Sequence, residues 1–180
     1  MSQYLNLAKQ KRSQGDNIDF QLSFHDFICE CYVKLKPCSY GVRIQKKLSE
    51  DLGLKVNPAS LNIGDVVINS KNGELKVSYL GKNNCYSLTH LRMWQKFGYY
   101  LFCLIDCDND FTPEFYLIDK YVMNKMKMTP MNGTKDSNSD NSNIELRASV
   151  KKNGEYHSLL KKENKLCGNS LTDLISYIKN

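Results

Sequence analysis

The sequence predicts a single mixed α/β domain, and three observations lead to that expectation. Two β-branched apolar runs, residues 63–68 and 74–80, flank a segment with an Asn-Gly pair, the strongest short signal for a β-hairpin. Residues 99–106 form a continuous apolar run, which is typical of a strand buried on both faces. Residues 16–35 and 39–52 instead repeat apolar side chains at helical spacing, so helices and strands share one chain.

The composition favours a cytoplasmic protein with a mildly basic surface. The chain has 180 residues and a formal net charge of +6, which suits a polyanionic partner. None of the seven cysteines forms a Cys-x-x-Cys pair, so we expect reduced, mostly buried thiols rather than a zinc site. Residues 1–19 are polar, unlike a signal peptide, and no apolar run approaches the ~20 residues of a membrane helix.

In the first half of the chain we expect two helices before the hairpin. The first lies within residues 16–35, and residues 1–15 before it are expected to be a frayed basic end. Ser39 is a suitable N-cap for the second helix, and Gly53 is a suitable stop. A short strand is then expected within residues 54–62.

In the second half we expect a helix, more strands and a long polar loop. The loop at residues 129–143 has almost no apolar side chain and is therefore expected to be mobile. In chain order the expected elements are a helix at 87–97, strands at 99–106 and 115–118, a short helix at 119–127, the loop, a strand at 144–150, a hairpin continuing to residue 160, and a closing helix at 170–178.

The first hairpin carries three polar residues that a plain hairpin would not need. Asp65 opens the first strand, and Glu74 and Lys76 lie two residues apart on the second, so these two point to one face. Two carboxylates and a main-chain carbonyl can hold Mg²⁺, which takes oxygen ligands and keeps some of its waters. The alternative is a solvated edge hairpin with ordinary surface charges.

The register of the hairpin decides whether the two acids meet. A tight turn at Asn72-Gly73 would place Asp65 near Leu80, several residues from Glu74. A turn shifted toward residues 69–71, or a β-bulge, would bring the acids together. The sequence leaves both registers open.

The pattern of Asp65 followed by Glu74-x-Lys76 resembles the PD-(D/E)XK nuclease superfamily, which has the restriction-endonuclease-like fold. Gly64 stands where that family commonly has proline. The resemblance implies an αβββαβ core, matched here over residues 39–106, within a single nuclease domain of residues 1–180. Residues 144–180 would then add a strand, a hairpin and a helix to that core.

The resemblance also implies a function and a set of site residues. Asp65, Glu74 and the Leu75 carbonyl would bind Mg²⁺, with Mn²⁺ as a substitute, and Lys76 would orient the attacking water. Residues on the two core helices would support this centre, namely Gln45, His90, Arg92 and Gln95. Basic residues of the loop and of the C-terminal part would contact DNA, namely Lys135, Arg147, Lys151 and Lys152.

The first core helix of the family often lends a further acid to the metal site. Gln45 and Asp51 flank the apolar face of the expected helix here, whereas Glu50 points nearly opposite. Gln45 carries no charge, so the centre can rest on two acids alone. A boundary position on the helix is the alternative role for Gln45.

The resemblance is to small type II restriction endonucleases, which cut a short specific site in double-stranded DNA. It implies a homodimer and a cognate DNA methyltransferase encoded nearby. One alternative keeps the fold and the chemistry, as a junction-resolving, nicking or transposon-type nuclease. The other alternative is a DNA-binding or interaction protein on the same fold without cleavage.

Overall fold

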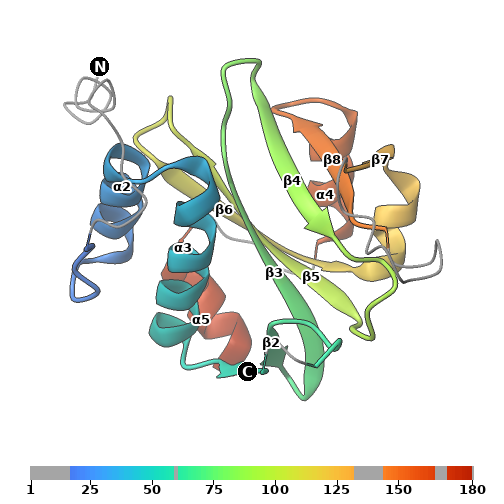
Figure 1. Cartoon of the computed structure of the whole chain (residues 1–180), viewed down its shortest axis with the longest axis horizontal. Helices are drawn as coiled ribbons and strands as arrows, with labels where there is room; N and C mark the ends of the chain where they lie inside the picture. Colours follow the sequence, from blue (N-terminus) through green and yellow to red (C-terminus); the bar gives the residue numbers. More distant parts are fainter. Residues whose placement is uncertain (1–16, 59–60, 132–143, 165–169, 180) are drawn as a thin grey trace.

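The structure of the protein, a computed structural model, describes residues 17–58, 61–131, 144–164 and 170–179. These residues form a central sheet with a layer on each face (Figure 1). The helices are α2 (Phe24–Lys34), α3 (Pro37–Leu52), the 3-10 helix η1 (Lys120–Lys125), α4 (Glu155–Glu163) and α5 (Leu171–Lys179). The strands are β1 (Lys55–Val56), β2 (Val66–Ile68), β3 (Lys71–Tyr79), β4 (Cys85–Leu91), β5 (Tyr99–Asp106), β6 (Thr112–Asp119), β7 (Met128–Pro130) and β8 (Leu146–Lys151).

The central sheet has five strands in the order β1-β2-β3-β5-β6. Strands β3 and β5 run parallel, from the pair Gly73 and Tyr99 to the pair Tyr79 and Ile105, and the other neighbours are antiparallel. The connection between the two parallel strands leaves this sheet, because β4 pairs with β8 in a separate three-stranded sheet, β4-β8-β7. The mixed α/β class predicted from the sequence is confirmed.

Each face of the central sheet carries its own hydrophobic core. Helices α2, α3 and α5 cover one face, where Leu101, Cys103 and Ile105 of β5 are buried among them. The small sheet and α4 cover the other face, where the intervening Tyr100 and Phe102 pack. Every residue of β5 is buried, which confirms the strand predicted from the apolar run at 99–106.

The two N-terminal helices lie where the sequence predicts them, except that α3 begins earlier than expected. The α2 helix is capped by Ser23, whose hydroxyl accepts a hydrogen bond from the Asp26 main-chain N–H at 3.1 Å. The α3 helix begins at Pro37, two residues before the expected cap Ser39, because proline suits the first helical position. It ends as predicted at Gly53, which has the left-handed φ of 62°.

The turn of the first hairpin does not lie at Asn72-Gly73. Asn72 and Gly73 lie inside β3, and the two-residue turn is formed by Asn69 and Ser70, both with positive φ. Gly73 is required for packing rather than for turning, because a Cβ there would lie 2.2 Å from the ring of Tyr99. Of the two registers that the sequence left open, the structure has the shifted one.

The helix expected at residues 87–97 is also wrong, because β4 occupies most of this segment. Tyr86 and Leu88 are buried at alternate positions, as in a strand. The register with β8 shifts between Leu88 and Leu91, and His90 there has a φ of 53°. This bulge turns Leu91 inward as well, so a strand acquired the three-residue apolar spacing of a helix.

The C-terminal part differs from the expected strand and hairpin in one element. Residues 155–160 belong to α4 rather than to a hairpin, with His157 and Leu160 buried at helical spacing. The strand predicted at 144–150 is confirmed as β8, the closing helix as α5, and the short helix at 119–127 as η1. Strand β7 lies partly within the expected loop, and residues 132–143, like the expected frayed end at 1–15, lie outside the described residues.

Most of the described cysteines are buried, as expected from the sequence. Cys29, Cys31, Cys103 and Cys107 are buried free thiols, and Cys85 is a partly buried one. In the part of the chain that the structure describes, no helix combines the length and the apolar character that a membrane crossing needs.

Candidate active site

Asp65 immediately precedes β2, next to the strand that carries Glu74 and Lys76. The pairing of β2 with β3 ends at Val66 and Gly73, and one further step in this register places Asp65 opposite Glu74. The Oδ2 atom of Asp65 accepts a hydrogen bond from the main-chain N–H of Leu75 at 3.2 Å. The structure therefore brings the two acids together.

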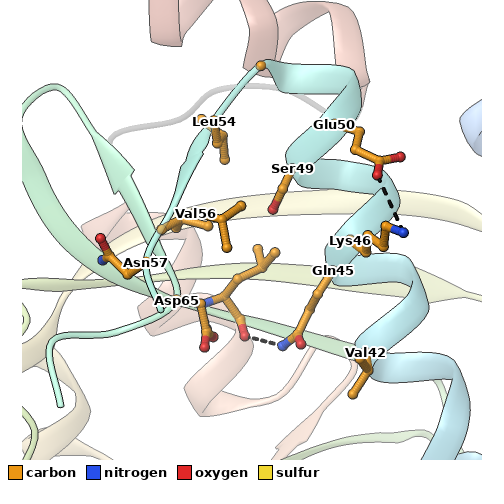
Figure 2. A pocket seen from close by; sticks show the side chains of 12 residues that line it. Val42, Gln45, Lys46, Ser49, Glu50, Leu54, Val56, Asn57 and Asp65 are labelled. Atoms are coloured by element: carbon orange, nitrogen blue, oxygen red, sulfur yellow. Dashed lines mark hydrogen bonds and ion pairs between the residues drawn. The ribbon is translucent and has the colours of Figure 1, made fainter. Parts of the chain in front are cut away.

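Gln45 of α3 reaches the same point of β3 from the helical layer. Its Nε2 donates a hydrogen bond of 2.5 Å to the main-chain oxygen of Leu75. Because β2 pairs with β3 only up to Gly73, Leu75 lies beyond the paired part of this edge. The side chains of Asp65 and Gln45 occupy the two backbone groups that a longer β2 would have paired. Figure 2 shows the side chain of Gln45 extending from α3 toward the side of the pocket where Asp65 lies.

Glu74 and Lys76 form a close ion pair on the opposite face of β3 from Leu75. Lys76 Nζ lies 2.5 Å from Glu74 Oε1, and Glu74 is only 1% exposed. Burial raises the pKa of Glu74 above its usual range, the Lys76 ammonium opposes this rise, and the negative charge of Asp65 adds to it. The two carboxylates are therefore close enough to repel, with Lys76 as the nearest compensating charge.

Two further predicted residues, His90 and Arg92, form a polar cluster at one end of β4. The carboxylate of Glu145, just before β8, accepts hydrogen bonds of 2.7 Å from His90 Nδ1 and from Arg92 Nε. Although burial acts to raise it, these two hydrogen bonds hold the pKa of Glu145 below its usual value. The charge of Arg92 also acts slightly against the rise that burial causes in the pKa of Glu74.

Lys120 of η1 is a neighbour of Glu74 that we did not predict. Its Nζ lies 4.4 Å from the ring centroid of Phe97 and donates a hydrogen bond of 2.5 Å to the Gln95 main-chain oxygen. Burial lowers the pKa of Lys120, and the charge of Glu74 partly offsets this. Only the pairing of β5 with β6 brings η1 here, so no local signal in the sequence would have identified Lys120.

Gln95, the fourth predicted supporting residue, is buried in the turn before β5. Its side-chain oxygen has no hydrogen-bond partner among the described residues. Its main-chain oxygen, held by Lys120, ties the turn to the same face of the sheet as Glu74.

The candidate DNA-contacting residues are spread over the C-terminal part. Arg147 and Lys151 are exposed on β8, and Arg147 Nε donates a hydrogen bond to Thr129 Oγ1 at 3.2 Å. Lys152 forms an ion pair of 2.5 Å with Asp106, six residues beyond the β5 partner of Glu74, so roughly 20 Å away along the strand. Lys135 lies outside the described residues.

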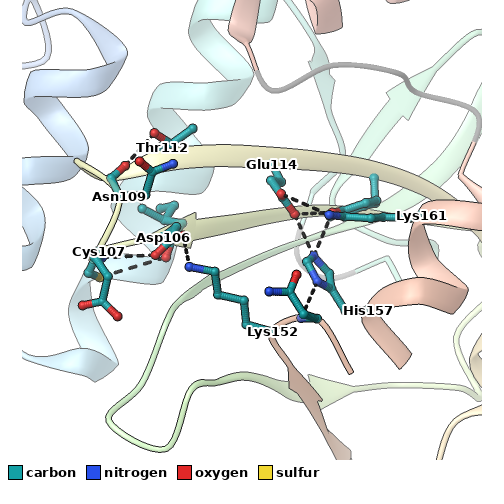
Figure 3. A network of polar contacts seen from close by, with 12 residues as sticks. Asp106, Cys107, Asn109, Thr112, Glu114, Lys152, His157 and Lys161 are labelled. Carbon is teal, nitrogen blue, oxygen red and sulfur yellow. Dashed lines mark hydrogen bonds and ion pairs between the residues drawn. The ribbon is translucent and has the colours of Figure 1, made fainter. Parts of the chain in front are cut away.

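A second polar network lies at that far end of the sheet (Figure 3). His157 of α4 is buried, and its Nδ1 accepts a hydrogen bond from the Asn153 main-chain N–H at 3.0 Å. Its Nε2 therefore carries the proton and donates to Glu114 Oε2 at 2.7 Å, while the hydroxyl of Tyr116 donates to the same oxygen. These contacts join α4 to β6, and every polar atom of the histidine ring is used within the protein.

A metal ion at the candidate site would rely on few ligands. Among the described residues no group of three or more His, Cys, Asp and Glu side chains is arranged to hold one. The oxygen donors available here are the carboxylate of Asp65, which contacts Leu75, the carbonyl of Leu75, and the carboxylate of Glu74 on the other face of β3. Such a set fits Mg²⁺, which accepts one or two carboxylates and retains waters, better than it fits zinc.

A pocket of about 690 Å³ opens beside Asp65 and Leu75, between α3 and the β1–β2 edge. Gln45, Asp65 and Leu75 contribute to its wall together with residues of α3 and β1 (Figure 2). Glu50 also borders the pocket, and the dashed line to Lys46 marks a contact of 3.8 Å. Asp51, the other acid considered on this helix, is instead paired with Lys47 at 2.7 Å.

No protein-family model and no curated protein matches this chain. The geometry around Asp65, Glu74 and Lys76 is therefore the basis for assigning a function.

Proposed function

We propose that the protein is a metal-dependent DNA endonuclease of the PD-(D/E)XK type. The observation that supports this most is the position of Asp65, which lies opposite Glu74 and is hydrogen-bonded to Leu75, between Glu74 and Lys76. The sequence allowed a register in which these residues lay far apart. The register found is the one that the proposed chemistry needs.

The order of elements supports the proposal in part. Helix α3, strands β1, β2 and β3, and strand β5 follow one another in the order αβββ–β of the expected core. The second helix of that core has no counterpart, because β4 and its sheet cover this face instead. The supporting residues His90 and Arg92 consequently come from a strand and a turn, where both pair with Glu145.

Asp65, Glu74 and the Leu75 carbonyl would hold the metal. A bound Mg²⁺ would supply positive charge against the scissile phosphate and would activate water. Lys76 forms an ion pair with Glu74 when no metal is bound. With a metal in place, its ammonium could orient a water beside the two acids. Gln45 keeps the Leu75 carbonyl directed out of the sheet edge.

Positive charge around the acids suits a phosphodiester substrate. Arg92 is fixed through its Nε by Glu145, which leaves the other guanidinium nitrogens as potential donors to a phosphate. Lys120 adds a second cation on the same side of the sheet. We further propose double-stranded DNA as the substrate, cut at a short specific site by a homodimer, as in type II restriction endonucleases.

Digestion of plasmid DNA tests this proposal. Several plasmids of different sequence are incubated with the protein in Mg²⁺, in Mn²⁺ and in excess chelator. We expect cleavage with either metal and none with chelator, and discrete bands would assign a restriction endonuclease. Nicking or structure-dependent cutting would assign another nuclease of this fold, and undiminished cleavage in chelator would contradict the metal site. DNA binding without any cleavage would assign the non-catalytic alternative.

A further inference from the structure

The pocket between α3 and β1 is bordered by two of the candidate site residues. Asp65 and Leu75 contribute to its wall, and the proposed metal and the scissile phosphate would lie beside them. Any part of a substrate that fills the pocket must then be joined to that phosphate or lie next to it. The chemistry of the remaining walls indicates which part it is.

The walls away from the acids combine apolar and uncharged polar groups. Val42 of α3 and Val56 of β1 are 69% and 59% exposed, and they border the pocket together with Leu54 (Figure 2). A ligand that covers these two valines removes apolar surface from water, which is favourable. Exposed apolar side chains clustered at one site often mark a binding surface. Ser49 and Asn57 add polar groups to the same walls.

The charges around the pocket disfavour a second phosphate in its interior. Asp65 and Glu50 line it with only Lys46 as a cation, and Lys46 already lies 3.8 Å from Glu50. A nucleobase is flat and uncharged, with apolar faces and a polar edge, so it suits these walls better than a phosphate or a sugar-phosphate segment does. A base can enter only after it has left the base stack, because stacked bases present only their edges.

We propose that this pocket receives one unstacked base of the strand being cut, next to the scissile phosphate. This inference rests on the proposed function and specifies its substrate, which is DNA that can release a base at the cut. Unstacking costs least where a base is already unpaired. Binding should therefore be tighter to DNA with an unpaired nucleotide than to a continuous duplex.

Fluorescence anisotropy with dye-labelled DNA tests the inference. The probes are a mixed-sequence single strand, its perfect duplex, and the same duplex with one unpaired nucleotide, all in chelator so that no cleavage occurs. We expect the probes with unpaired bases to bind the parent protein about tenfold more tightly than the perfect duplex does. Val42→Asp and Val56→Ser should reduce that preference, since both side chains border the pocket.

Tyr121→Asp is the matched control. Tyr121 is an exposed apolar residue of η1, away from the pocket, and its replacement adds the same charge as Val42→Asp. Both sites are exposed, so folding should survive each change. The inference is overturned if the three probes bind alike, if none binds, or if the pocket variants keep the parental preference. Failure of the proposed function gives a different result, because the parent would then cut no DNA with Mg²⁺ whatever the probes show.

Discussion

The carboxylate of Asp65 accepts a hydrogen bond from the main-chain N–H of Leu75, with 3.2 Å between Oδ2 and the nitrogen. A side chain thus occupies a backbone group of β3 at the point where β2 stops pairing. This contact fixes Asp65 to the residue between Glu74 and Lys76. The candidate centre therefore depends on how the short segment before β2 is held.

Gly64→Ala should disrupt that segment. Gly64 has a φ of 89°, and a Cβ there would lie 2.4 Å from the main-chain oxygen of Gly73. We expect a loss of at least about 2 kcal/mol of unfolding free energy together with reduced cleavage, because Asp65 must move. Urea unfolding measures the first effect. Gly41→Ala is the control, since its Cβ would meet no atom within 4 Å and a helix interior favours alanine by about 1 kcal/mol.

Gln45→Glu should change how the protein responds to metal. The variant replaces the Nε2 donor to the Leu75 oxygen with a carboxylate beside Asp65. Without metal we expect the free energy of unfolding to fall by about 1 kcal/mol, because a hydrogen bond is lost and the two acids repel each other. Mg²⁺ should then raise the melting temperature of this variant more than that of the parent. An equal response in Gln45→Glu, Gln45→Ala and the parent would mean that no metal binds at this point.

Arg92→Ala should weaken DNA binding with little effect on folding. The Arg92–Glu145 pair is partly exposed, and such pairs contribute at most about 1 kcal/mol to stability. If Arg92 contacts a phosphate, the slope of log affinity against log salt should fall by about one counterion. Lys34→Ala is the control, because Lys34 is a paired cation on α2. Equal salt slopes in the two variants would remove Arg92 from the DNA contact.

The Glu114–His157 pair should make stability sensitive to acid. The hydrogen bond from His157 lowers the pKa of Glu114 from 4.5 to about 2. A depressed pKa stabilises the fold above the ordinary pKa, and this contribution is lost as the pH falls from about 4.5 to 2. The free energy of unfolding should fall by an amount on the order of 3 kcal/mol over this pH range. In urea unfolding at several pH values, Glu114→Gln should show a flatter pH dependence, and an unchanged one would contradict the assignment.

Local patterns predicted those elements whose burial repeats regularly. The run at 99–106 predicted β5, and the spacing in 39–52 predicted α3 because one face of that helix is buried. Predictions from local patterns failed where tertiary packing decided the role of a residue. Gly73 was interpreted as a turn residue, but it makes room for the ring of Tyr99. The bulge at His90 gave β4 the apolar spacing of a helix.

The candidate site shows the same division. Residue types and spacing identified Asp65, Glu74, Lys76 and Gln45, because strand and helix periodicity fix which side chains share a face. The contact between Asp65 and Leu75 depends on a turn at Asn69 and Ser70. As a hairpin signal, Asn-Ser is weaker than the nearby Asn-Gly pair, so the sequence did not favour this turn. Long-range pairing alone delivers Lys120, so it could not be predicted from neighbouring residues.

Cleavage by Asp65→Asn and Glu74→Gln, measured beside DNA binding by the same proteins, tests the central claim most directly. The metal's charge contributes several kcal/mol to lowering the barrier, so each variant should cut DNA at least about 100-fold more slowly than the parent in Mg²⁺. Lys76→Ala should be similarly slow, and all three should still bind DNA. Arg147→Ala should instead bind more weakly, since this exposed residue lies outside the proposed centre. If Asp65→Asn and Glu74→Gln cut DNA as fast as the parent, the residues around Leu75 are not a catalytic centre.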